Sequence, residues 1–262
     1  MSAPGAGPGL PTGPGAGAGA VDHVGVLVPA RDEEELLGRC LHGLAAAAEA
    51  LRAERPGVRT RVVVVLDGCA DDSRGAVETA PWPSGLTRPE VLQTAAAGVG
   101  AARSVGAARL LGHVRAADGA PARSWLAGTD ADSVVPASWL LAQVEAAEQG
   151  WDAWVGTVVL SARDRLASRW AEQQQHVEGH LHVHGANLGV RGSAYTAAGG
   201  YPPVLTGEDE SLVEALQATG AWLLRTAGHP VVTSDRRSGR APGGVAADLQ
   251  ALAALDGEPR AS

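Results

Sequence analysis

Residues 62–73, which read VVVVLDGCADDS, decide the fold of this 262-residue chain. The first five residues are apolar and four of them are valines, which favour a strand with both faces buried. Asp67-Gly68 ends that strand, and we expect a short helix over residues 72–79. Strands that are apolar on both faces are typical of parallel sheets that have helices on both sides.

The same alternation continues in both directions along the chain. Residues 21–28 predict a strand that Pro29 stops, and residues 33–54 carry leucines at helical spacing. We expect further strands at residues 90–94, 125–129, 151–160 and 231–232, and further helices at residues 101–111, 137–149, 212–217 and 248–255. Alternating strands and helices predict an α/β fold with right-handed crossovers and a mostly parallel sheet.

The chain is expected to hold a single folded domain. It would cover residues 21–245, after a disordered tail rich in Gly, Pro and Ala over residues 1–20. Residues 246–262 would form a short helix and a second tail. We predict a cytoplasmic protein, because no apolar run is long enough to span a membrane and the first residues do not resemble a signal peptide.

Composition excludes several classes of protein. The chain has 29 acidic residues against 21 arginines and no lysine, a net charge of −8. General binding to nucleic acid or to an anionic membrane would require a basic surface. The cysteines, Cys40 and Cys69, are too few for a disulfide framework and are predicted to be reduced thiols.

Acidic residues follow three of the predicted strands. Glu33 follows the first, Asp67 the second, and Asp130 and Asp132 follow residues 125–129. Ligands bind at this edge of open α/β sheets, where neighbouring carboxylates repel one another unless a cation lies between them. A divalent ion shared with a substrate phosphate would remove that repulsion. Capping or turn formation is the alternative for any single acid, and it is weaker for Asp130 and Asp132, whose alternation can direct both to one ligand.

Two segments offer arginine to a phosphate group. Residues 98–106 (GVGAARSVG) open a helix with small residues, but Arg103 stands where a dinucleotide fingerprint has its third glycine. The loop 234–240 (SDRRSGR) is the densest cationic stretch, and we expect Arg237 and Arg240 to contact a diphosphate. Solvated turns remain the alternative for both segments.

Six motifs, in chain order, resemble those of family-two glycosyltransferases of the GT-A fold. They are residues 26–34 (VLVPARDEE), 62–73, 98–106, 130–132 (DAD), 185–187 (GAN) and 207–209 (GED). The resemblance spans roughly residues 21–244 and implies one Rossmann-like domain, with residues 21–133 binding the nucleotide and residues 134–245 the acceptor. It also implies a UDP- or GDP-linked sugar donor and a Mn²⁺ or Mg²⁺ cofactor.

The resemblance assigns roles residue by residue. The expected donor-binding residues are Pro29, Ala30, Arg31, Glu33, Asp67, Arg103 and Asp130. Asp132 would ligate the metal, with His229 as an additional ligand, and Asp209 would be the catalytic base. The expected acceptor-binding residues are Gly185, Ala186, Asn187 and Glu208. Leu66 precedes Asp67 where the family often has a second acid, so the donor base stays open.

Four of the eight histidines lie within residues 176–184. His176 and His180 have the i, i+4 spacing of a helical zinc site, but Glu178 is in the wrong position for a zinc protease. His182 and His184 would share one face of an extended segment that leads to Gly185. We therefore expect His184 in the acceptor pocket, with a polar surface loop as the alternative.

Together these features predict a metal-dependent glycosyltransferase that acts on a hydroxyl acceptor with inversion. A retaining transferase for a small hydroxy acid and a non-catalytic nucleotide-sugar-binding protein are the alternatives. A nucleotidyltransferase is disfavoured, because such enzymes commonly place lysine at the phosphates and this chain has none. We expect a soluble or peripheral acceptor, and the sequence leaves a homodimer open.

Overall fold

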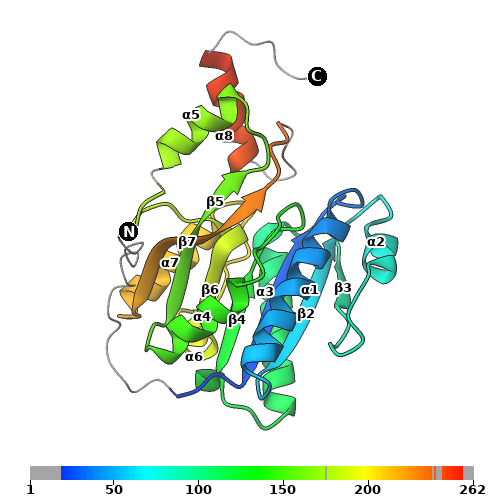
Figure 1. Cartoon of the computed structure of the whole chain (residues 1–262), viewed down its shortest axis with the longest axis vertical. Coiled ribbons are helices and arrows are strands. Elements are labelled where there is room, and N and C mark those ends of the chain that lie inside the picture. The colour runs from blue at the N-terminus through cyan, green and yellow to red at the C-terminus, as the bar shows by residue number, and fades with distance from the viewer. Residues whose placement is uncertain (1–18, 175, 238, 240–243, 256–262) are drawn as a thin grey trace, which may run out of the picture.

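The computed structural model describes residues 19–174, 176–237, 239 and 244–255. The predicted N-terminal tail therefore lies almost wholly outside the described residues. One seven-stranded sheet crosses the molecule in the order β3-β2-β1-β4-β6-β5-β7 (Figure 1). Its strands are β1 (His23–Ala30), β2 (Arg59–Asp67), β3 (Glu90–Thr94), β4 (Ser124–Gly128), β5 (Ala153–Leu160), β6 (Leu188–Arg191) and β7 (Leu223–Thr233). All strand pairs are parallel except the two that involve β6. The predicted α/β fold with a mostly parallel sheet is confirmed.

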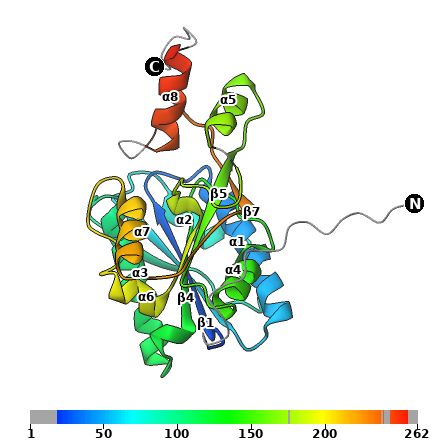
Figure 2. The same ribbon diagram turned by 90° about the vertical axis from the view of Figure 1, so that its left-hand side faces the viewer.

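Helices cover both faces of the sheet, as Figures 1 and 2 show. On one face lie α1 (Leu37–Glu54) and α4 (Trp139–Glu148), with α2 (Ser73–Thr79) packed against α1. The other face carries α3 (Val99–Ala116), α6 (Gly192–Ala197) and α7 (Glu208–Ala218). Two further helices, α5 (Arg165–Gln174) and α8 (Val245–Leu255), pack on each other beyond the C-terminal ends of β5 and β7.

Strand alternation divides the core into two layers. Along β2, Val62, Val64 and Leu66 pack toward α1, whereas Val63 and Val65 pack toward α3. This period of two is why a continuous valine run can serve both faces of the sheet. The chain has no phenylalanine, and its largest fully buried side chains are tryptophans 125, 139, 154 and 170.

The structure differs from the sequence-based expectation mainly after residue 160. The sequence did not predict β6, which has only four residues and is antiparallel to both neighbours. A strand this short carries too little alternation to be recognised. β7 was predicted only at residues 231–232, because the Gly228–Pro230 segment interrupts the apolar pattern where the pairing of β5 with β7 shifts register.

The first helix also begins later than predicted, at Leu37 instead of Glu33. Asp32 has a left-handed φ of 53°, and the Glu33 amide donates a 2.9 Å hydrogen bond to the Ser73 hydroxyl. Residues 32–35 therefore form a turn that brings the end of β1 to the start of α2. Among the described helices, none has the length and apolar character needed to cross a bilayer.

Candidate active site

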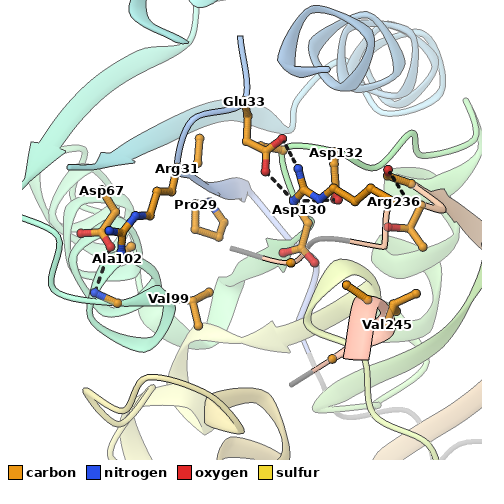
Figure 3. Close-up of a pocket in the computed structure, with 18 of the residues that line it drawn as sticks. Pro29, Arg31, Glu33, Asp67, Val99, Ala102, Asp130, Asp132, Arg236 and Val245 are labelled. Carbon is orange, nitrogen blue, oxygen red and sulfur yellow. Dashed lines mark hydrogen bonds and ion pairs between the residues drawn. The ribbon is translucent and has the colours of Figure 1, made fainter. Parts of the chain in front are cut away.

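The carboxyl ends of β1, β2 and β4 surround a cavity of about 250 Å³, which we call the first cavity (Figure 3). The loop after β7 and the first residues of α8 complete its wall. Seven residues that the sequence predicted for donor or metal binding line it: Pro29, Ala30, Arg31, Glu33, Asp67, Asp130 and Asp132. They meet here because the ends of parallel strands share one edge of the sheet.

Asp67 organises one end of this cavity. Its buried carboxylate accepts hydrogen bonds from the Thr94 hydroxyl at 2.6 Å and from the amides of Ala97 and Gly98 at 2.8 and 2.9 Å. Gly98 has a φ of 92°, a conformation that favours glycine, and α3 starts at the next residue. Asp67 thus fixes the loop that leads into α3.

At the other end, Arg236 reaches across the cavity to two carboxylates (Figure 3). Its Nη1 lies 2.7 Å from Oε2 of Glu33, and its Nη2 lies 2.5 Å from Oε1 of Glu33 and 3.1 Å from Oδ2 of Asp132. Burial, followed by the nearby Asp130 charge, raises the pKa of Asp132 to about 6, while Arg236 opposes that shift.

The arginines of this loop are placed differently from the expectation. Arg236 lines the first cavity, whereas Arg237 does not, and the Arg237 carbonyl accepts a hydrogen bond from the Gln250 side chain. Arg240 lies outside the described residues. Neighbouring side chains on an extended segment point in different directions, so only the folded loop decides which arginine enters the cavity.

Arg103 is buried beneath the cavity between two acids. Its Nε lies 2.9 Å from Oε1 of Glu208 and its Nη2 lies 2.5 Å from Oδ1 of Asp130, and its guanidinium stands 5.8 Å from the centre of the Tyr201 ring. The side chain is only 2% exposed. The neighbouring acids raise its pKa against the opposing effect of burial. Arg103 is therefore a permanent cation that joins α3 to the loop after β4 and to α7.

Two glycines make room for that guanidinium. A Cβ atom on Gly185 would lie 2.5 Å from Nη2 of Arg103, and one on Gly128 would lie 3.1 Å from its Nη1. A side chain at Gly185 would therefore displace the guanidinium, whereas one at Gly128 would crowd it. Glycine at the end of β4 (Gly128) and at the start of residues 185–187 therefore leaves room for the buried Arg103 side chain.

A second cavity of about 290 Å³ adjoins the first, and both are lined by Asp130, Thr233, Gly244 and Val245. The predicted residues that line it are His184, Gly185, Ala186 and Asp209. Asp209 is held there by two backbone amides: Gly185 donates to Oδ2 at 2.6 Å and Glu210 donates to Oδ1 at 2.9 Å. Each oxygen keeps a further lone pair that can face the cavity.

Five described residues that the sequence predicted for the site line neither cavity: Arg103 and Arg237, described above, and Asn187, Glu208 and His229. Asn187 is fully buried and its amide makes four hydrogen bonds, to the indoles of Trp139 and Trp154 and to the carbonyls of Thr157 and His229, so no group is left for an acceptor. Glu208 is buried against Arg103. His229 hydrogen-bonds to Ser138 at 2.8 Å and lines neither cavity, so we do not retain it as a metal ligand.

The histidine cluster does not form a helical zinc site. α5 ends at Gln174, and His176 and His180 lie in the irregular segment that follows. His182 and His184 do lie face to face, with ring centres 6.3 Å apart and planes inclined by 13°. Burial lowers the pKa of His184 to about 4, so its ring is neutral at pH 7, and its Nε2 donates a hydrogen bond to Oε1 of Gln174 at 3.2 Å.

The acids of the first cavity fit a divalent cation that a substrate helps to bind. Carboxylate oxygens are the ligands that Mg²⁺ and Mn²⁺ prefer, and a cation would offset the burial and the Asp130 charge that raise the pKa of Asp132. Among the described residues, three ligand atoms from histidine, cysteine or acidic side chains converge within 4.8 Å only at Asp32, Cys69 and Asp71, which line neither cavity. Glu33, Asp130 and Asp132 do not converge in this way, so a metal there needs phosphate oxygens to complete its ligands.

Comparisons with known proteins place this chain in a family. A comparison with curated protein sequences found no match. Among solved structures, S. aureus TarS residues 1–349 are 17% identical with a TM-score of 0.57, and the match covers 88% of this chain and 69% of that one. In a longer TarS structure the match covers 42% of that protein.

Two other structures are similar at comparable identity. The mannosyltransferase PcManGT from Pyrobaculum calidifontis, in complex with GDP-Man and Mn²⁺, is 18% identical with a TM-score of 0.58, covering 95% of this chain and 73% of that one. Glucosyl-3-phosphoglycerate synthase from Mycobacterium tuberculosis, in complex with Mn²⁺, UDP and phosphoglyceric acid, is 16% identical with a TM-score of 0.50, covering 93% and 81%. These likenesses support the fold. The family model described as glycosyl transferase family 2 matches residues 25–200, and the chain therefore belongs to that family and is a glycosyltransferase with the GT-A fold.

Proposed function

We propose that this protein transfers a sugar from a UDP- or GDP-linked donor to a neutral hydroxyl acceptor, with a divalent metal ion and with inversion at the anomeric carbon. One observation carries the proposal: two cavities meet at Asp130, one lined by strand-end carboxylates and Arg236, the other bordered by the amide-held carboxylate of Asp209. The complex of PcManGT with GDP-Man and Mn²⁺ supports the donor class and the metal.

In this proposal the first cavity holds the nucleotide. Pro29, Ala30 and Arg31 contact the nucleoside, and Asp132 faces the diphosphate. Asp132 is the chain's ligand to Mn²⁺ or Mg²⁺, with the diphosphate completing the site. When bound, that ion offsets the negative charge of the departing nucleoside diphosphate. The donor sugar would lie near Asp130, where the two cavities join.

Asp209 is the proposed catalytic base. An acceptor hydroxyl in the second cavity loses its proton to a carboxylate oxygen of Asp209 as it attacks the anomeric carbon. The amides of Gly185 and Glu210 hold that carboxylate in place at the cavity wall. Glu208 cannot serve this purpose because Arg103 holds it outside both cavities.

The charge of the second cavity favours a neutral acceptor over a small hydroxy acid. Asp130, Asp209 and Glu210 all line it, and its described lining includes no arginine. An anionic acceptor would therefore meet like charges at the cavity wall, and the buried Arg103 behind that wall is already paired with Asp130 and Glu208. The non-catalytic alternative is disfavoured because Asp209 is ordered at the cavity wall, where a base is needed.

A panel of UDP- and GDP-sugars, tested with Mn²⁺ and with Mg²⁺, examines the proposal. We expect one donor to raise the melting temperature in the presence of metal, because binding to the folded state raises stability. Asp132→Ala should lose this effect. Failure of every nucleotide sugar to bind the wild type with either metal would contradict the proposal.

A second experiment isolates the base. Asp209→Asn should keep donor binding and lose about 10²–10⁴-fold in transfer rate, while Glu214→Gln, an exposed acid on the same helix, should behave as wild type. Full transfer by Asp209→Asn would exclude Asp209 as the base. NMR of the product gives its anomeric configuration, and retention would contradict the inverting mechanism.

A further inference from the structure

The Arg236 guanidinium lies between Glu33 and Asp132, two acids that line the first cavity. Glu33 is 6% exposed and the Asp132 side chain is 13% exposed, and all three contacts of Arg236 described above are made to them. These residues come from three distant segments, after β1, after β4 and after β7. The ion pairs therefore exist only in the folded protein, and they close the cavity at its acidic end.

Among the described arginines, Arg236 alone forms ion pairs with Glu33 and Asp132. The other buried arginine beside the cavity, Arg103, is committed to Asp130 and Glu208. Without a cation, Glu33 and Asp132 would be two buried like charges, which repel each other in a poorly solvated site. In the ligand-free protein, Arg236 therefore does for these acids what a divalent ion would do.

A metal on Asp132 and the present position of Arg236 are incompatible. Nη2 of Arg236 lies 3.1 Å from Oδ2 of Asp132, within hydrogen-bonding distance of an oxygen that a metal would use. A dication bound to that carboxylate would repel the guanidinium at such short range. A donor diphosphate, in contrast, offers pairs of oxygens that match the guanidinium fork.

We propose that Arg236 is an exchangeable counter-ion, which neutralises Glu33 and Asp132 in the free protein and moves to the donor diphosphate when metal and nucleotide bind together. This inference rests on the proposed function. Arg236 is suited to the movement because its side chain is 25% exposed, the most of the three, and it lies on a loop three residues after β7. Metal and nucleotide should then each increase the affinity for the other.

The substitution Arg236→Gln tests separately the contact of Arg236 with Glu33 and Asp132 and its proposed contact with the donor diphosphate. Without Arg236, Mn²⁺ alone no longer competes with a guanidinium for Asp132, so we expect it to bind about tenfold more tightly. UDP or GDP in the presence of Mn²⁺ loses the arginine fork and should bind about tenfold more weakly. A residue with a merely structural role would weaken both.

Mn²⁺ binding is measured from the EPR signal of the free ion, without nucleotide, and UDP and GDP binding by calorimetry with saturating Mn²⁺. Arg115→Gln is the matched control. It makes the same change in net charge by removing an exposed arginine near the C-terminal end of α3, whereas the N-terminal end of that helix lines the first cavity. Arg236→Lys keeps the charge and should bind Mn²⁺ as weakly as wild type, and it serves as a second test if Arg236→Gln folds poorly.

Unchanged or weaker Mn²⁺ binding by Arg236→Gln would overturn the competition at Asp132. Unchanged nucleotide affinity would overturn the movement to the diphosphate. If wild type binds neither UDP nor GDP with Mn²⁺, the proposed function fails, whereas the Mn²⁺ titration without nucleotide still decides whether Arg236 guards Asp132.

Discussion

Replacing Arg103 by methionine should expose how much of this site depends on one buried cation. The substitution keeps the apolar stem and removes the guanidinium that pairs with Glu208 and Asp130. Glu208 is only 5% exposed and would be left as an isolated buried carboxylate, whereas the Asp130 side chain is 39% exposed and remains hydrated. Nearly all of the energetic cost therefore comes from Glu208.

We expect Arg103→Met to lower the free energy of unfolding by about 3–5 kcal/mol at pH 7.5, the usual cost of removing one partner from a buried ion pair. The loss should shrink as pH falls. Burial already raises the pKa of Glu208 against the effect of Arg103, and without Arg103 it rises further. A carboxyl whose pKa is raised in the folded state binds its proton more tightly there than in the unfolded state. Lowering the pH toward 5 therefore stabilises the variant relative to wild type. The gain is up to about 1.4 kcal/mol for each pH unit below the folded-state pKa of Glu208.

Urea denaturation of wild type and variant at pH 7.5 and pH 5 measures both effects. Arg109→Met provides the comparison, since Arg109 lies on the same helix and pairs at the surface with Glu90 at 2.7 Å. Its effect should be small at both pH values, as for other exposed pairs. A loss below 1 kcal/mol for Arg103→Met, or a loss of equal size at both pH values, would refute the reasoning.

Three further substitutions test the surroundings of the site. Asn187→Ala should lower the free energy of unfolding, measured by urea denaturation, by about 3–5 kcal/mol, because it leaves two buried indole donors and two carbonyls unpaired. A loss under 1 kcal/mol would contradict this structural role and favour the predicted role of Asn187 in acceptor binding. Gly185→Ala would place a Cβ atom 2.5 Å from Arg103 and should lower the melting temperature, while Gly57→Ala, with nothing within 4 Å, should not; equal melting temperatures would contradict this. The His184 pKa of about 4 lies below the usual 6.5, so its neutral form favours folding and stability falls between pH 6.5 and 4, by up to about 3 kcal/mol. His184→Gln should reduce that acid loss and exposed His42→Gln should not, as denaturant midpoints at pH 7 and 4.5 would show.

Much of the framework could be predicted from local pattern. Valine runs such as residues 62–66 predict strands buried on both faces, and the acids that follow three such strands must meet at one edge whatever the rest of the chain does. The strand Glu90–Thr94 was predicted with its observed bounds. The later half was harder, because β6 has four residues and the apolar pattern of β7 is interrupted.

The composition bounded the chemistry of the site. In a chain without lysine, any positive side chain that meets a buried acid or a phosphate at neutral pH must be arginine or a protonated histidine. The sequence therefore narrowed the phosphate contacts to a few segments, including residues 98–106 and the loop 234–240. It could not decide which arginine of that loop faces the cavity, because Arg236 and Arg237 have the same chemistry and differ only in direction.

The tertiary structure alone decided the partners of the charged and polar residues. Glu208 and Asp209 are neighbours in sequence, yet one is tied to Arg103 beneath the cavity and the other borders the cavity under two amides. Asn187 belongs to a motif that suggests acceptor binding, yet its amide holds two tryptophans in the core. The sequence by itself determined which chemical groups stand at the strand ends, because backbone direction follows from local pattern. Which of them face each other depends on contacts between residues as much as 203 positions apart, as for Glu33 and Arg236, and such contacts exist only once the chain has folded.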